Sequence, residues 1–402
     1  MSGAYTDIKS ICNELKNVVQ DYDHNTVSIN FMTKSDGVRK QRLNELDCSF
    51  MYTQMLKKII LTLDFNAEHF KELISYCRGQ FVNNPRELQK IDKIEREYDA
   101  EQAILWYTYE SCLYSMVNKA LRMMDVELIV KMGFFIRDLH NHITVLYLQK
   151  YSEQNRSDPF TVFRGQGFTQ IDFDHLKANE GGLLAFNNFL STTRNHTVAR
   201  KFAQSTVRRL NLVGVVFVIT IDPSLSTTPF AQLQDVSYHA AEQEILFSMH
   251  SVFRTTSVQY IEGGDSLWQV ELTLHNDNDH DLQILMSSIE DQASQASGWS
   301  RLGSLMISLA EFDKAQQLYD TILYQKPDEN TAGGIYHYLG FIKHNQGEYQ
   351  KALSYYEKAL EIQQKALPAN HPDLATSYNN IAGVYADMGE YSKVRSCFDR
   401  VL

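Results

Sequence analysis

The stretch Ala241-Glu242-Gln243-Glu244-Ile245-Leu246-Phe247 decides how the fold of this chain is interpreted. Its two carboxylates lie two residues apart and lead directly into an apolar run that is typical of a buried strand. Because side chains alternate between the two faces of a strand, a strand that opens at Glu244 would place Glu242 and Glu244 near one face. Two like charges so close together raise the free energy unless a cation lies beside them. An isolated Glu-x-Glu pair is most often a solvated strand edge, so the other motifs of the chain must decide between the two interpretations.

Length and composition indicate a globular protein with room for two or three domains. Of the 402 residues, 44% are hydrophobic and 22% are charged, which provides ample material for a core. The net charge of −11 argues against nucleic acid or an anionic membrane as the main partner. Residues 1–20 lack the apolar core of a signal peptide, and the longest apolar run, 212–221, is too short for a membrane span. We therefore expect a cytoplasmic protein.

Neither the cysteines nor the acidic residues have the spacing of a metal site. Counted from Asp277, the stretch 276–281 begins like a calcium loop, but its sixth residue is Leu282 and its twelfth is Ser288, where such a loop has Gly and Glu. We expect a polar turn there, no bound metal, and reduced thiols at the cysteines. The five cysteines are Cys12, Cys48, Cys77, Cys112 and Cys397.

The period of the hydrophobic pattern changes near residue 159. Before it, apolar side chains recur every three to four residues, as in a buried helical stripe from Leu105 to Leu121, and Asp125 is placed to cap the next helix. After it, β-branched and aromatic runs predict strands, with a short helix capped by Asn195. The predicted strands cover 161–165, ending in a turn at Gly165, and 189–193, 213–221, 244–248, 252–260 and 267–274. Helices followed by mostly antiparallel strands predict an α+β fold.

An internal repeat begins at residue 295. Two Leu-Gly pairs are each followed by an Ala twelve residues after the Gly and by a Tyr four residues later, and a third copy has the same layout with conservative changes. The three copies are Gly303, Ala315 and Tyr319; Gly340, Ala352 and Tyr356; and Ala382, Val394 and Phe398. This layout resembles tetratricopeptide repeats of the kinesin-light-chain type, which implies an all-α solenoid. Because Leu402 lies within the second helix of the third repeat, an apolar face is left uncapped, and we expect that further repeats or a capping helix are missing or that the sequence is a fragment.

Three motifs in order, Phe163-Arg164-Gly165, Phe189-Leu190-Ser191-Thr192-Thr193 and Glu242-Gln243-Glu244, resemble the Arg–Ser–Glu-x-Glu signature of the arginine-specific mono-ADP-ribosyltransferases and related bacterial toxins. The segment from Trp106 to Arg122 and the run 181–184 are also similar to this family. The resemblance implies a split β-sandwich catalytic domain over 46–276. An N-terminal extension would then cover 1–45, a linker 277–294, and about three repeats 295–402, the last incomplete.

The resemblance implies a reaction that breaks the nicotinamide–ribose bond of NAD and passes ADP-ribose to an arginine. Glu244 would stabilise the oxocarbenium-like transition state, and Glu242 would hold the incoming guanidinium. Arg164, with Gly165, would bind NAD through a phosphate. Ser191 would orient Glu244 or the ribose, and Phe189, or alternatively Phe186, would pack on the nicotinamide. Thr193 replaces a second Ser of the family but keeps a hydroxyl.

Several alternatives stay open at this level. The co-substrate is NAD or NADP, and no metal is needed. The enzyme is a transferase that modifies an accessible arginine of a target protein, or an NAD glycohydrolase that uses water instead. The third alternative is a catalytically silent adaptor, in which only the repeats are functional and bind a protein or peptide. In the transferase, Tyr238 would offer a stacking platform for the target.

Overall fold

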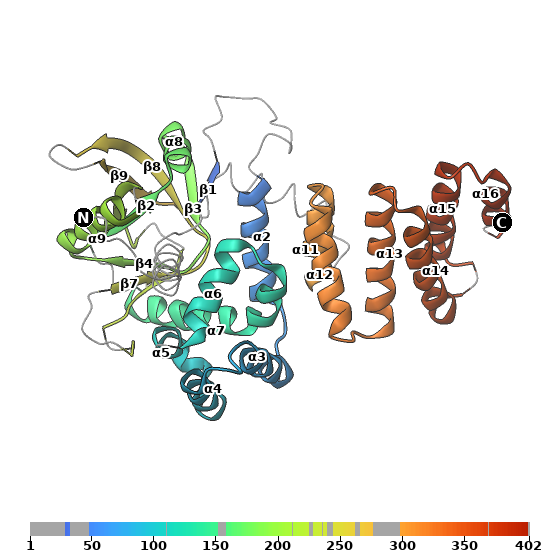
Figure 1. Ribbon diagram of the computed structural model, residues 1–402, viewed down its shortest axis with the longest axis horizontal. Helices are drawn as coiled ribbons and strands as arrows, with labels where there is room; N and C mark the ends of the chain where they lie inside the picture. The colour runs from blue at the N-terminus through green and yellow to red at the C-terminus, as the bar shows by residue number, and fades with distance from the viewer. Residues whose placement is uncertain are drawn as a thin grey trace, which may run out of the picture. The chain divides into compact units, whose positions relative to one another are not determined.

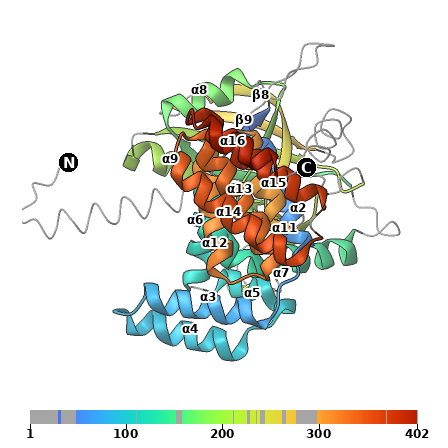
Figure 2. The ribbon, with the colours of Figure 1, turned by 90° about the vertical axis from the view of Figure 1, so that its right-hand side faces the viewer.

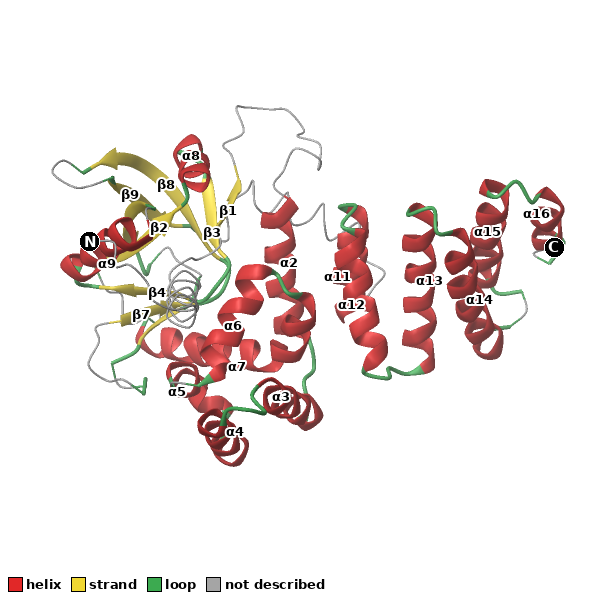
Figure 3. Ribbon diagram, viewed as in Figure 1, coloured by secondary structure: helices red, strands yellow, loops and turns green. Residues whose placement is uncertain are grey.

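The computed structural model describes residues 29–32, 48–109, 111–151, 158–210, 212–224, 228–234, 236–238, 244–261, 266–275, 298–368 and 370–400. The chain forms two compact units, Met1–Ser287 and Ser288–Leu402. The first contains helices and a sheet, and the second contains helices (Figures 1 and 3). The predicted fold class, an α+β domain followed by a helical solenoid, is therefore confirmed. The predicted polar turn at 276–281 lies outside the described residues.

The helical part of the first unit follows the predicted pattern with one difference. Asp125 caps the longest helix by accepting from the Leu128 amide. The predicted stripe from Leu105 to Leu121, however, is interrupted: one helix ends at Thr108, and Ser111 caps the next by accepting from Leu113. In Figure 2, α3 and α4 run side by side. The helices are α2 (Cys48–Thr62), α3 (Ala67–Gln80), α4 (Pro85–Glu97), α5 (Ala103–Thr108), α6 (Cys112–Met123) and α7 (Val126–Lys150), with the short 3₁₀ turn Ala100–Gln102 before α5.

The part of the chain that the structure describes forms a sheet of nine strands in the order β1-β3-β8-β9-β5-β2-β4-β7-β6. All neighbours are antiparallel except β5 and β9, which confirms the mostly antiparallel prediction. The strands are β1 (Ile29–Met32), β2 (Phe160–Phe168), β3 (Leu183–Phe186), β4 (Leu190–Thr193), β5 (Val213–Ile221), β6 (Phe230–Gln232), β7 (Glu244–Phe247), β8 (Ser251–Tyr260) and β9 (Leu267–Leu274); helices α8 (Gln170–Ala178) and α9 (His196–Leu210) complete this unit.

The sheet folds back on itself around an aromatic core. Phe186 on β3 and Phe217 on β5 are three strand steps apart, which is about 14 Å in a flat sheet. Their ring centroids nevertheless lie 5.4 Å apart. Both rings are fully buried, in a cluster that also holds Phe230, Phe247 and Phe253. The two halves of the sheet therefore face each other across this core, as in a β-sandwich.

Helix α9 lies unusually close to strand β2. A Cβ placed on Gly165 would come 1.9 Å from the carbonyl oxygen of Ala199 and 2.8 Å from the amide nitrogen of Ala203. Both alanines are buried. The prediction that the strand ends in a turn at Gly165 is wrong, because β2 continues to Phe168. Gly165 is needed in the strand interior so that a helix backbone can approach it.

The described residues of the second unit form three antiparallel helix pairs, as the repeat predicts (Figure 1). Small residues on the first helix of a pair contact the aromatic residue on the second. A Cβ on Gly303 would lie 2.3 Å from the Tyr319 ring, and a Cβ on Gly340 would lie 2.7 Å from the Tyr356 ring. The pairs are α11 (Gly298–Ser308) with α12 (Phe312–Tyr324), α13 (Glu329–Asn345) with α14 (Tyr349–Ala366), and α15 (Pro372–Asp387) with α16 (Tyr391–Phe398).

Replacing Gly340 with alanine is expected to destabilise the repeats by about 1–3 kcal/mol, because the rigid Tyr356 ring occupies the space of the new methyl group. Gly334→Ala is the matched control on the same helix, α13. No atom of the described residues lies within 4 Å of the position that a Cβ would take there, so helix propensity should stabilise the variant by up to about 1 kcal/mol. Urea unfolding followed by far-UV circular dichroism measures both. Equal stability of the two variants would contradict the described helix contact.

None of the described helices is both long enough and apolar enough to cross a membrane.

Candidate active site

Strands β2, β4 and β7 are neighbours in the sheet, and their register aligns one residue from each. Phe163 on β2 pairs with Thr193 on β4, and Thr193 pairs with Glu244 on β7. Ser191 lies two residues before Thr193, so its side chain extends from the same face of β4. The strands therefore bring Ser191 and Glu244 to one side of the sheet, although they are far apart in the sequence.

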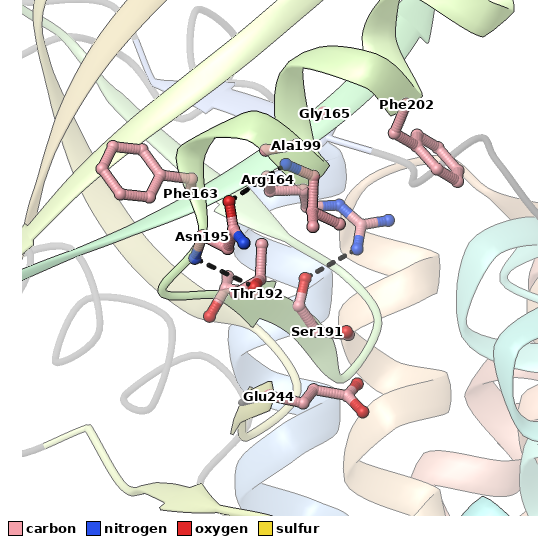
Figure 4. A pocket seen from close by; sticks show the side chains of 11 residues that line it. Phe163, Arg164, Gly165, Ser191, Thr192, Asn195, Ala199, Phe202 and Glu244 are labelled. Atoms are coloured by element: carbon pink, nitrogen blue, oxygen red, sulfur yellow. Dashed lines mark hydrogen bonds between the residues drawn. The ribbon is translucent and has the colours of Figure 1, made fainter. Parts of the chain in front are cut away.

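A cleft of about 700 Å³ opens over these strands and the start of α9. Arg164, Ser191 and Glu244 extend toward the same side in Figure 4, so the cleft combines a guanidinium, a hydroxyl and a carboxylate. The lining residues are Phe163, Arg164, Gly165, Ser191, Thr192, Thr193, Asn195, Val198, Ala199, Phe202 and Glu244.

Arg164 is fixed by the neighbouring strand. Its Nη1 donates a 2.7 Å hydrogen bond to the carbonyl oxygen of Ser191, and its Nε contacts the Gln166 side-chain oxygen at 3.5 Å. Burial lowers the pKa of the Arg164 guanidinium, while Tyr114, Tyr107 and Glu244 favour its charged form. A guanidinium stays protonated at neutral pH in any case and has five N–H donors. Arg164 is thus a cation whose position is fixed by hydrogen bonds, and its other N–H donors can bind an anion such as phosphate.

Two hydroxyls beside Ser191 have structural partners. Thr192 Oγ1 donates to the carbonyl oxygen of Ile245 at 2.9 Å, which ties β4 to β7. Thr193 Oγ1 accepts from the Asn195 amide at 3.1 Å, and the Asn195 side chain in turn accepts from the amides of Thr197 and Val198. The predicted cap at Asn195 is confirmed, and the helix that it starts is fifteen residues long. The hydroxyl of Thr193 therefore shapes the entry into α9.

The structure does not bring the predicted aromatic residues to the cleft. Phe189 is 3% exposed, with its ring 5.8 Å from Tyr107, and Phe186 is fully buried in the core. Neither lines the cleft, where Phe163 and Phe202 supply the aromatic rings instead. Phe202 is 40% exposed, which suits a ring that packs against a ligand. The predicted cap at Asn195 could have identified Phe202 from the sequence, because this cap places the first two turns of the helix beside Thr193.

Tyr238 is on the surface, as its predicted role requires. It is 50% exposed, its amide donates to Thr108 Oγ1 at 2.9 Å, and its ring lies 5.0 Å from that of Tyr109. Glu242 lies outside the described residues, so its predicted role stays a prediction. Among the described residues, no cluster of three or more His, Cys, Asp or Glu is arranged to hold a metal, and the expectation that the reaction needs no metal also stays a prediction.

Two tyrosines near the site were not singled out by the sequence. Tyr107 on α5 and Tyr114 on α6 have ring centroids 5.1 Å apart. Burial raises the pKa of both phenols; for Tyr114, Arg164 lowers it in part and Glu244 raises it further. Tyr114 is 37% exposed. The helical region therefore contributes two phenols whose pKa values respond to the charges of Arg164 and Glu244.

Comparisons with known proteins identify two families in the sequence. The sequence model of the family "NAD:arginine ADP-ribosyltransferase" matches residues 60–280, and a tetratricopeptide-repeat model matches 331–402. Solved structures that are similar include Plx2a, an ADP-ribosyltransferase toxin from Paenibacillus larvae, at 16% identity and a TM-score of 0.33, covering 54% of this chain and all of that one. The Vis toxin from Vibrio splendidus is 18% identical with a TM-score of 0.33, covering 55% and 90% of the two chains. No curated protein matches the chain significantly.

Proposed function

Because the chain belongs to the NAD:arginine ADP-ribosyltransferase family, which uses NAD as its substrate, we propose that it transfers ADP-ribose from NAD to an arginine of a target protein and releases nicotinamide. The observation that carries the proposal is the meeting of Arg164, Ser191 and Glu244, from three adjoining strands, in one cleft. A cation for phosphate and a carboxylate for a developing positive charge are the two groups that the reaction needs most.

The proposed chemistry breaks the bond between C1′ of the ribose and the pyridinium nitrogen. The bonding electrons leave with nicotinamide, which departs as a neutral base, so no general acid has to protonate it. Positive charge then develops on C1′ and the ring oxygen of the ribose. Glu244 sets a negative charge beside that cation, Arg164 holds the pyrophosphate, and Ser191 orients Glu244 or a ribose hydroxyl.

The acceptor completes the reaction. A guanidinium nitrogen of the target arginine attacks C1′, a new C–N bond forms, and the nitrogen loses one proton to a carboxylate, for which we propose Glu242. A carboxylate also suits the fork of the guanidinium and holds the acceptor before attack. If water attacks instead, the same cleft produces free ADP-ribose, which makes the acceptor step the difference between a transferase and a glycohydrolase.

The tetratricopeptide repeats support a second proposal, that the Ser288–Leu402 unit binds a protein or peptide. This partner is the target itself or a regulator that brings the target to the enzyme. Solenoids of this type bind through extended surfaces made by successive repeats.

The proposed function is tested by nicotinamide release from NAD with and without agmatine, a small guanidino acceptor. The wild type should release nicotinamide and form ADP-ribosyl-agmatine, whereas Glu242→Gln should keep NAD hydrolysis but lose transfer by about a hundredfold, since the acceptor carboxylate is gone. Mass spectrometry separates the two products, and the same assay with NADP ranks the two co-substrates. A wild type that releases nicotinamide but never modifies agmatine is a glycohydrolase or uses another acceptor. A wild type that releases none refutes the catalytic proposal.

A further inference from the structure

Helix α9 belongs to a stretch of the chain that contains no acidic residue. Residues 181–221 include five Lys and Arg but no Asp or Glu, although the whole chain has 49 Asp and Glu against 38 Lys and Arg. Four of these five side chains are described: Arg194 before the helix, and Arg200, Lys201 and Arg208 within it. We call these four residues the basic face. Positive charge concentrated in this way in an acidic protein is typical of a surface that binds a negatively charged partner.

The cations of the basic face have no counterion within the described part of the chain. Arg194 lies over the Phe160 ring at 4.7 Å, and none of the four makes an ion pair there. Arg194, Lys201 and Arg208 are exposed, and Arg200 is partly buried. Because water hydrates exposed charges well, the lack of a partner costs the fold little. These cations are therefore available to an anion from outside the chain.

The basic face lies next to the cleft but does not line it. Val198 and Phe202 extend from α9 into the cleft lining, where Figure 4 shows Phe202. Lys201 is three residues after Val198, and residues three apart are neighbours on a helix surface. Arg208 is two helical turns after Lys201 and so lies on the same face. No residue of the basic face is among the lining residues, so the basic face borders the cleft from outside.

The size of a protein acceptor explains what would cover this surface. A specific protein–protein interface covers about 800 Å² on each partner, far more than one arginine side chain occupies. A target whose arginine enters the cleft must therefore also contact the surface around it. Helix α9 has fifteen residues, is about 22 Å long, and forms one wall of the cleft. Its outer face is thus within the area that a bound target needs.

We propose that the basic face of α9 is a docking surface for acidic residues that surround the target arginine. This inference rests on the proposed function, since it names the class of protein that the transferase would modify. Exposed cations attract an acidic surface and orient it, whereas they repel a basic one. Because the basic face lies outside the cleft, its charge should affect the acceptor and leave NAD binding unchanged.

The test compares two short synthetic peptides as acceptors, each with one central arginine, flanked by glutamates in one and by glutamines in the other. We expect wild type to modify the glutamate peptide with at least tenfold higher kcat/KM at low ionic strength. About 0.5 M NaCl should remove most of this preference, because salt screens exposed charges. Replacing Arg200, Lys201 and Arg208 together with glutamine should reduce the preference to less than threefold. KM for NAD and transfer to agmatine should stay within twofold of wild type.

A matched control removes the same charge elsewhere in the first unit. Lys71 on α3, Arg86 on α4 and Lys119 on α6 are exposed, make no ion pair among the described residues and do not line the cleft. Their joint replacement with glutamine changes the net charge equally, so at least half of the peptide preference should remain. Thermal unfolding checks that both triple variants fold. If the first is unstable, Lys201→Gln and Arg208→Gln, at exposed positions, replace it, and each should lower the preference at least twofold.

The outcomes separate this inference from the proposed function. A wild type that modifies agmatine but does not favour the glutamate peptide overturns the docking surface and leaves the proposed function standing. An equal loss of preference in the control triple variant also overturns it, since the effect would then follow from net charge alone. A rise of KM for NAD above fivefold in the basic-face variant overturns it as well, because the cations would then serve the co-substrate. A wild type that releases no nicotinamide refutes the proposed function, and this inference with it.

Discussion

Replacing Glu244 with glutamine is expected to lower nicotinamide release by about a thousandfold, with and without agmatine. Glutamine keeps the size and one acceptor oxygen of the side chain but removes its charge. A unit charge about 4 Å from the developing ribose cation, at an effective dielectric constant near 20, contributes about 4 kcal/mol. Each 1.36 kcal/mol changes the rate tenfold, which gives the expected factor.

The loss should appear in kcat, because the charge matters more as the cation develops than when neutral ribose is bound. NAD binding, measured by isothermal titration calorimetry, should change by less than about fivefold, since Arg164 still provides the cation for the pyrophosphate. The two readouts separate a catalytic carboxylate from one that merely shapes the cleft.

Glu271→Gln is the matched control for this experiment. Glu271 is a partly buried glutamate on β9 of the same sheet, where it accepts from the Gln269 side chain, and it does not line the cleft. Its replacement should leave nicotinamide release within twofold of wild type. Release by Glu244→Gln within tenfold of wild type would contradict the assigned role, and so would an equal loss in Glu271→Gln.

Local patterns were enough to predict the strands and the helix on which the candidate site residues lie. Alternation and β-branched runs located β4, β5 and β7, and the hydrogen-bonding side chain of Asn195 located the start of α9. Once β4 and β7 pair, the period of a strand fixes Ser191 and Glu244 on one face. These inferences hold because each depends on neighbours within a few residues.

The predictions that failed depend on contacts between distant segments. Gly165 was taken for a turn residue, but its lack of a side chain is required by the Ala199 carbonyl oxygen, more than thirty residues later in the chain. Phe189 is as hydrophobic as Phe202, and only the fold determines that the first is buried against Tyr107 while the second lines the cleft. The hydrogen bonds from Asn188 to Asn118 likewise join residues seventy positions apart, and no periodicity in one sequence reveals such a pair.

Replacing Gly165 with alanine is expected to destabilise the first unit by at least about 3 kcal/mol, near the upper end for added volume in a packed core. The new methyl group would lie 1.9 Å from the Ala199 carbonyl oxygen, 2.9 Å from its carbonyl carbon and 2.8 Å from the Ala203 amide nitrogen. All three are backbone atoms, so no side-chain rotation relieves the overlap. In a domain of this size the loss corresponds to a fall of roughly 6–12 °C in melting temperature.

Gly79→Ala, on α3 of the same unit, is the matched control. Within the described part of the chain, no neighbouring atom lies within 4 Å of the Cβ position there. The substitution should therefore leave stability unchanged or raise it slightly, because alanine favours a helix more than glycine does. Thermal unfolding followed by circular dichroism compares the two variants with wild type. A Gly165→Ala variant that melts within 2 °C of wild type would show that α9 does not rest on β2 as described.

The same substitution should affect NAD binding even in molecules that fold. To accept the methyl group, α9 must move away from β2, and it carries Val198 and Phe202, which line the cleft together with Glu244. The sheet residues Arg164, Ser191 and Glu244 stay connected through β2, β4 and β7. Folded Gly165→Ala should therefore bind NAD at least tenfold more weakly by calorimetry while keeping its reacting groups in register. Unchanged affinity would mean that the α9 side of the cleft contributes nothing to the bound co-substrate, and that strands alone bind it.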